Sequence, residues 1–198
     1  MFKSIIGLML VGSMLIKPVS TCVDEDKNYG IIFVGDSRTV GMETAVKSDS
    51  NLDNVYFVAK VGKGYNWFSE YGVDRVNHII ETNTDVTNWQ VVTNLGVNDL
   101  GNVDKYVDTY DELLATEWTN VDLYYLSVNP VDESKCTSVN NEDIIKFNEK
   151  IKKQGNYINS YEFVKSHMVT RDGLHYSNSL SSDLCHRVIS VLEDERIY

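Results

Sequence analysis

The protein chain has 198 residues and a formal net charge of −11 at pH 7; 42% of its residues are hydrophobic and 24% are charged. This length predicts one domain with its own core, and the composition is typical of a globular protein. The acidic balance, without a cluster of Lys or Arg, argues against nucleic acid and anionic membrane surfaces as partners, because both attract basic patches. Neutral or weakly charged substrates are easier for such a chain to bind.

The first 21 residues differ in composition from the rest of the chain. Lys3 precedes an apolar run over residues 5–16, and small residues follow that run. The run is too short to anchor a protein across a bilayer, so we expect no integral membrane span after processing. A basic start, a short apolar stretch and a small-residue exit predict a signal peptide over residues 1–21 and a mature domain over residues 22–198. The protein is therefore expected to be secreted or to lie on the cell surface.

The three cysteines give little further information. Cys22 stands where a lipoprotein carries its acylated cysteine, so a lipid anchor is an alternative to free secretion, although Thr21 is unusual before such a residue. An exported location would allow a disulfide between Cys136 and Cys185, but two cysteines alone do not predict that they pair. The sequence shows no Cys-x-x-Cys pair and no paired-histidine spacing, so we expect no metal.

From residue 29 onward, short runs rich in β-branched and aromatic residues alternate with longer segments of helical spacing. The runs predict strands over residues 30–35, 55–61, 89–95, 121–128 and 157–163. Apolar residues at helical spacing predict helices around residues 73–80, 106–114, 144–151 and 184–192. Strands that alternate with helices imply right-handed crossovers and a parallel sheet covered on both faces. We therefore expect a single three-layer α/β/α domain with about five parallel strands, similar to flavodoxin in outline.

Functional groups in such a sheet collect at the carboxyl ends of the strands. Three predicted strands are followed by Gly-Asp-Ser-Arg at 35–38, Gly-Lys-Gly at 62–64 and Gly-Val-Asn-Asp at 96–99. A fourth segment, Asp-Gly-Leu-His-Tyr at 172–176, precedes the last predicted helix. Each segment alone is ordinary turn chemistry, and the Gly-Lys-Gly lacks the spacing of a phosphate-binding loop. Together the four segments meet at one edge of the sheet.

The four segments contain the parts of a nucleophilic site. The hydroxyl of Ser37 needs a neighbouring base, and histidine is the residue type that serves near neutral pH. His175 needs a carboxylate on its other ring nitrogen, and Asp172 is close enough in sequence for one turn to bring the two side chains together. An oxyanion needs donors, for which the backbone N–H groups of Ser37 and Gly62 and the side-chain amide of Asn98 are candidates.

These segments resemble the sequence blocks of the SGNH hydrolases, also called GDSL esterases and lipases. Residues 33–37 resemble the first block, Gly62 the second-block glycine, Asn98 the third-block asparagine, and residues 172–175 the Asp-x-x-His of the last block. The resemblance covers about residues 30–180 with the blocks in the family's order. It implies Ser37 as nucleophile, Asp172 and His175 as its partners, and catalysis without a metal or organic cofactor.

The sequence departs from the family pattern at two positions. The family name implies Leu after the serine, where this chain has Arg38. We expect Arg38 to point along the start of the helix and to influence substrate choice without taking part in the reaction. Gly62 and Gly64 both compete for the role of oxyanion donor; Gly62 is preferred because it directly follows the predicted strand, and a side chain there would obstruct substrate.

The resemblance implies a secreted serine esterase that cleaves carboxylic esters, of O-acetylated glycans or of lipids, through an acyl-Ser37 intermediate. Two alternatives are an acyltransferase that moves the acyl group to a sugar or peptidoglycan hydroxyl, and a non-catalytic surface binding protein on the same scaffold. The aromatic residues Tyr65, Trp67 and Phe68 either line an acyl or sugar site or pack a helix onto the sheet. The sequence does not indicate an oligomeric state.

Overall fold

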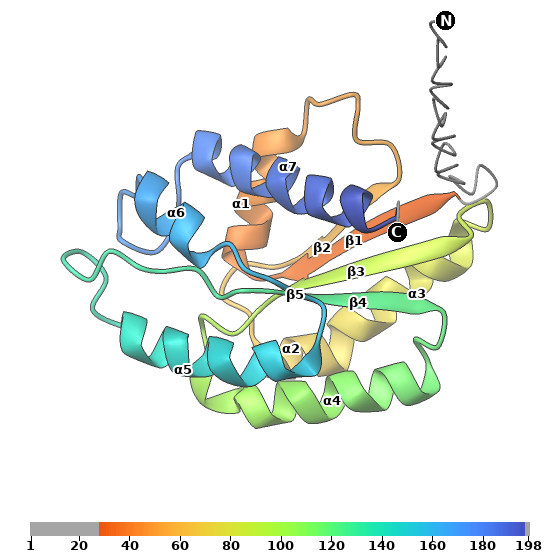
Figure 1. The fold of residues 1–198 in the computed structure, drawn as a ribbon, viewed down its shortest axis with the longest axis horizontal. Helices are drawn as coiled ribbons and strands as arrows, with labels where there is room; N and C mark the ends of the chain where they lie inside the picture. The colour runs from red at the N-terminus through yellow and green to blue at the C-terminus, as the bar shows by residue number, and fades with distance from the viewer. Residues whose placement is uncertain (1–27, 197–198) are drawn as a thin grey trace, which may run out of the picture.

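A five-stranded parallel sheet forms the centre of the molecule (Figure 1). The computed structural model describes residues 28–196 and places the strands in the order β2-β1-β3-β4-β5, with every pair parallel. The strands are β1 (Tyr29–Gly35), β2 (Val55–Ala59), β3 (Asn88–Asn94), β4 (Val121–Leu126) and β5 (Tyr157–Ile158). This order is that of flavodoxin-like doubly wound sheets, so the predicted α/β architecture is confirmed.

Helices cover both faces of the sheet (Figure 1). One face carries α1 (Ser37–Val46), α6 (Tyr161–His167) and α7 (Asn178–Glu195). The other face carries α2 (Tyr65–Trp67), the π-helix η1 (Phe68–Gly72), α3 (Val73–Thr82), α4 (Val103–Thr116) and α5 (Asn141–Ile151). Two short 3-10 turns, η2 (Leu100–Asn102) and η3 (Lys152–Gln154), flank α4 and α5.

Strand β1 contributes to the hydrophobic cores on both sides of the sheet. Ile31 and Phe33 pack in the core under α1 and α7, whereas Ile32 and Val34 pack in the core under α3 and α4. Side chains alternate across a strand, so a strand buried on both faces has a continuous apolar sequence. This pattern is the reason that β1 was predictable.

The predicted fifth strand is wrong over most of its length. The structure pairs only Tyr157 and Ile158 with β4, and α6 begins at Tyr161. The backbone N–H of Ser160 donates to the hydroxyl of Ser127 at 3.0 Å instead of to a strand carbonyl, which ends the ladder. The aromatic residues that favoured a strand in the sequence therefore lie in a helix. The predicted second and fourth strands also run two residues too far, since β2 ends at Ala59 and β4 at Leu126.

The expectations about export, membrane spans and cysteine pairing have different outcomes. The predicted signal peptide, residues 1–21, and Cys22 lie outside the described residues. Within residues 28–196, none of the helices has the length and hydropathy that a membrane crossing requires. Cys136 and Cys185 are both free and buried, in the cores of opposite faces, so the disulfide that the sequence left open does not form.

Candidate active site

The connection between β1 and α1 presents Ser37 at the carboxyl edge of the sheet. β1 ends at Gly35 and α1 begins at Ser37, so Asp36 alone joins the two elements. The carboxylate of Asp36 accepts a hydrogen bond from the backbone N–H of Arg38 at 2.9 Å and caps the helix. Because Asp36 fills the capping role, the hydroxyl of Ser37 is available to other partners, and its backbone N–H lies at a helix N-terminus.

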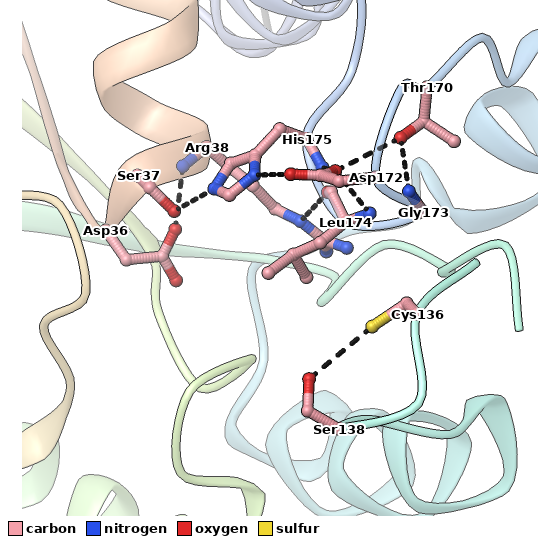
Figure 2. A network of polar contacts seen from close by, with 10 residues as sticks. All are labelled: Asp36, Ser37, Arg38, Cys136, Ser138, Thr170, Asp172, Gly173, Leu174 and His175. Carbon is pink, nitrogen blue, oxygen red and sulfur yellow. Dashed lines mark hydrogen bonds and ion pairs between the residues drawn. The ribbon is translucent and has the colours of Figure 1, made fainter.

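The structure brings Ser37, His175 and Asp172 together in one line (Figure 2). The hydroxyl oxygen of Ser37 lies 2.9 Å from Nε2 of His175. The other ring nitrogen, Nδ1, lies 2.6 Å from Oδ2 of Asp172. Serine, imidazole and carboxylate therefore have the contacts in which the imidazole can take the serine proton while the carboxylate orients the ring.

The loop before α7 fixes the carboxylate of Asp172. Its Oδ1 accepts the backbone N–H groups of Leu174 at 2.9 Å and His175 at 2.8 Å. Gly173 has a φ of +82°, and a Cβ there would collide with the backbone of Cys136, so this tight turn requires glycine. The hydrogen bond from the His175 ring, followed by those from the backbone, holds the pKa of Asp172 well below its usual range. Asp172 is therefore ionised throughout the neutral range.

Asp36 is the second carboxylate near the site, and its environment is the opposite of that of Asp172. It is only 1% exposed, and burial raises its pKa from 3.8 to about 6. The backbone N–H and the charge of Arg38, together with His175, counteract part of that rise. The two carboxylates thus differ in role: Asp36 caps a helix from a buried position, and Asp172 orients the imidazole from an exposed one.

The side chain of Arg38 does not point along the start of the helix, as the sequence suggested, but crosses to two other segments; Arg38 is only 6% exposed. The guanidinium donates hydrogen bonds to the carbonyl oxygens of Asn129 at 2.7 Å, Leu174 at 3.1 Å and Pro130 at 3.3 Å. Since all three acceptors are backbone groups, no pattern of side chains in the sequence reveals them.

Two of the three predicted oxyanion donors, Gly62 and Asn98, come from the loops after β2 and β3. The side-chain amide of Asn98 donates to the carbonyl of Lys63 at 2.7 Å and so ties the two loops together. Gly62 has a φ of +68° with open space where a Cβ would stand. Gly64 instead packs against the carboxylate of Asp99, which also accepts the backbone N–H of Tyr65 at 2.7 Å. Gly64 therefore has a packing role.

An open groove of about 1250 Å³ is lined by both Gly62 and Asn98. Of the aromatic residues singled out from the sequence, Tyr65 and Trp67 line it, whereas Phe68 is fully buried in the core. Tyr65 and Trp67 also pack against that core from partly buried positions, so all three residues pack a helical segment onto the sheet, and the acyl or sugar site stays a prediction. Charged and aromatic side chains that the sequence analysis missed also line the groove: Lys60, Lys63, Glu70, Tyr71 and Arg75.

Solved structures share this architecture, although no protein-family model and no curated protein matches the chain. The C-terminal catalytic domain of peptidoglycan O-acetyltransferase A from Streptococcus pneumoniae, with a methylsulfonyl adduct, superposes with a TM-score of 0.60 at 16% identity, over 85% of this chain and 94% of that one. A GDSL-like lipase from Bacteroides thetaiotaomicron gives a TM-score of 0.64 at 16% identity, over 89% and 93%. The chain has the fold of the GDSL-type hydrolases. A member of the lipolytic G-D-S-L family from Veillonella parvula matches with a TM-score of 0.55 at 15% identity, over 82% and 97%. The GDSL resemblance inferred from the sequence is thereby confirmed for the fold.

Proposed function

We propose that this protein is a serine esterase that hydrolyses carboxylic esters through an acyl-Ser37 intermediate. The observation that carries the proposal is the continuous line of contacts from the Ser37 hydroxyl through His175 to Asp172, at 2.9 and 2.6 Å. The GDSL-type fold supports it, because solved proteins with this fold are described as a lipase and an O-acetyltransferase.

The reaction has two halves that use the same groups. In the first, the Ser37 oxygen attacks the ester carbonyl carbon while Nε2 of His175 takes the serine proton. The tetrahedral intermediate then expels the alcohol, which leaves with that proton, and the acyl group stays on Ser37. In the second half, a water molecule gives a proton to His175 and attacks the acyl carbon, and Ser37 leaves with the proton. Asp172 stays ionised and holds the ring throughout.

Three N–H groups are proposed to stabilise the oxyanion of the tetrahedral intermediate. The backbone N–H groups of Ser37 and Gly62 are two of them. The side-chain amide of Asn98 supplies the third, since one of its two hydrogens bonds the carbonyl of Lys63 and holds the other in a fixed direction. The nucleophile, base and oxyanion donors of this mechanism are all residues of the chain, so it uses no metal or organic cofactor.

We propose that the groove lined by Gly62 and Asn98 holds the substrate, and its lining favours a polar ester, such as an O-acetylated glycan, over a lipid. Trp67 and Tyr71 offer flat apolar faces for a sugar ring, and Lys60 and Arg75 border them with charge. A lipid chain would instead favour a continuous apolar lining. The predicted signal peptide over residues 1–21 is consistent with a secreted or cell-surface enzyme acting on extracellular glycans.

A second candidate function is acyl transfer to a sugar or peptidoglycan hydroxyl. The likeness to the peptidoglycan O-acetyltransferase domain favours it. In that case the acceptor hydroxyl, rather than water, gives its proton to His175 and attacks acyl-Ser37. Product analysis separates the two reactions, because hydrolysis releases the free acid whether or not an acceptor alcohol is present, whereas transfer forms a new ester only with the acceptor.

Labelling with a fluorophosphonate probe tests the proposal directly, alongside hydrolysis of p-nitrophenyl acetate. The wild-type protein should be labelled, and Ser37→Ala should lose labelling together with about 10⁴-fold or more of the esterase rate. Ser182→Ala is a matched control, because the Ser182 hydroxyl also lies 3.4 Å from a histidine, His186, that contacts an aspartate. The Ser182→Ala protein should be labelled by the probe and should hydrolyse p-nitrophenyl acetate at the wild-type rate. An unlabelled, inactive wild-type protein would favour the non-catalytic binding protein.

A further inference from the structure

Arg38 joins three segments that are distant in the sequence. It directly follows Ser37 in α1, yet its guanidinium reaches the carbonyl of Leu174, 136 positions along the chain, at 3.1 Å. It also reaches the carbonyls of Asn129 at 2.7 Å and Pro130 at 3.3 Å, in the segment after β4. One buried side chain therefore connects the residue after the nucleophile with the residue before His175.

The segment after β4 is itself held firmly. The side-chain oxygen of Asn129 accepts hydrogen bonds from the hydroxyls of Ser127 at 3.1 Å and Ser160 at 2.8 Å, and all three side chains are buried. Tyr176 completes the enclosure of Arg38. Its ring lies 4.8 Å from the guanidinium carbon, and its hydroxyl donates to the Pro130 carbonyl at 2.7 Å.

This environment suits a guanidinium and no other side chain. A buried cation is costly unless its N–H groups are paired, and only the guanidinium has a planar fork of donors that can reach three carbonyls at once. Lysine could bond fewer of them from a single nitrogen, and leucine none. Within residues 28–196, Arg38 is also the one side chain that donates to the Leu174 carbonyl, next to His175.

We propose that Arg38 is a positioning residue that sets the separation of Ser37 and His175. This inference rests on the proposed esterase function. Arg38 touches no reacting atom: it fixes the Leu174 carbonyl against the rigid segment at Asn129, and the imidazole follows through the backbone. Reaction rates are sensitive to such placement, since a shift of about 1 Å can cost about 10²-fold.

Arg38→Ala tests the proposal through its kinetics and through chemical rescue. The kcat for p-nitrophenyl acetate should fall about 10²-fold while KM changes less than about threefold, because the defect lies in the alignment of the base. Added guanidinium chloride at a concentration well below denaturation should recover about tenfold of the lost rate, whereas sodium chloride at the same ionic strength should recover none. The kcat of Arg38→Lys should lie between those of the wild type and Arg38→Ala.

Arg187→Ala is the matched control, because its guanidinium also lies over an aromatic ring, at 5.0 Å from Phe163, but on the exposed side of α7. It should keep the wild-type kcat and show no response to guanidinium. A wild-type kcat in Arg38→Lys would overturn the positioning role. So would a loss of kcat in folded Arg38→Ala that added guanidinium does not reverse.

Hydrogen exchange of the segment 170–176, followed by mass spectrometry, gives a measurement that does not depend on activity. Arg38→Ala should take up deuterium faster in this segment than the wild type, with Arg187→Ala unchanged. If the wild type shows no esterase activity or labelling, the proposed function fails, and this exchange experiment still reports whether Arg38 holds the loop. If Arg38→Ala does not fold, the same exchange is measured in Arg38→Lys, and unchanged uptake there overturns the proposal.

Discussion

Asp172 acts through hydrogen bonds that keep an exposed carboxylate ionised and fixed in direction. Its pKa lies well below the usual range because the His175 ring and two backbone N–H groups all donate to it. In Asp172→Asn the amide keeps a similar shape but loses the charge. An amide in that place no longer selects the tautomer of His175 that leaves Nε2 free to accept the serine proton.

Asp172→Asn is therefore expected to lower kcat/KM by about 10³- to 10⁴-fold. The measurement is kcat/KM for p-nitrophenyl acetate in both proteins at one neutral pH. Asp183→Asn, at an exposed aspartate of α7, is the control and should keep the wild-type kcat/KM. A folded Asp172→Asn protein with a kcat/KM within about tenfold of the wild type would show that the Asp172 carboxylate does not orient the base.

Single residues of the site differ in how far the sequence predicts them. The contacts among Ser37, His175 and Asp172 were predictable because these residue types fit one another chemically and their order along the chain matches a known set of blocks. Arg38 was not, because it acts on backbone carbonyls 91, 92 and 136 positions away, and every residue type offers a carbonyl. The packing of Gly64 against the carboxylate of Asp99 also could not be read from the sequence, because the two residues are 35 positions apart.

At the scale of elements, an ion pair ties α7 to the connection between α1 and β2. Nε2 of His186 lies 2.8 Å from Oδ2 of Asp49, and its Nδ1 lies 2.9 Å from the carbonyl of Ser182. Both ring nitrogens face acceptors, so the imidazolium, with a proton on each nitrogen, fits this position best. The hydrogen bond to Asp49 accordingly raises the pKa of His186 above its usual value.

This pair should make the docking of α7 depend on pH. A histidine whose folded-state pKa is raised contributes stability that is fully present below its unfolded pKa of about 6.5 and is lost as pH rises through the folded value. His186→Gln should therefore lower the Tm more at pH 5.5 than at pH 8.5, as measured by far-UV circular dichroism. His78→Gln, at an exposed histidine of α3, should show no such difference. An equal loss of Tm at both pH values would mean that His186 is not charged in the folded protein.

The strands that the sequence predicted best are those buried on both faces of the sheet. β1 and β3 are buried on both faces; β1 has a continuous apolar run, and β3 carries Trp89, Val91 and Val92 among polar residues. Tyr161 and Phe163 favour a strand by local preference, but the contact of Ser160 with Ser127 ends the ladder before them. At residues 65–72, which form α2 and η1, the sequence offered a helix as one of two alternatives, because local preference is weak where aromatic residues dominate.

At the scale of the whole molecule, one sheet separates two cores and shares strands with both. The core under α1 and α7 contains Leu184, and the core under α3 and α4 contains Trp89 and Trp118, with Trp67 packed against it. These are all three tryptophans of the chain, so tryptophan fluorescence reports on one face only. Because β1 and β3 contribute side chains to both faces, losing one core removes the support of the other, and unfolding should be a single cooperative transition.

Leu184→Ala tests that cooperativity by damaging the face that carries no tryptophan. Removing a fully buried leucine side chain should cost about 2–5 kcal/mol of unfolding free energy. In urea, the transitions followed by tryptophan fluorescence and by far-UV circular dichroism should coincide, and both should move to lower urea by the same amount. Leu114→Ala, at a leucine 36% exposed on α4, should shift them much less. A fluorescence transition that stays at the wild-type urea concentration, with a circular dichroism curve in two steps, would mean that the two faces unfold separately and that the chain is not one cooperative domain.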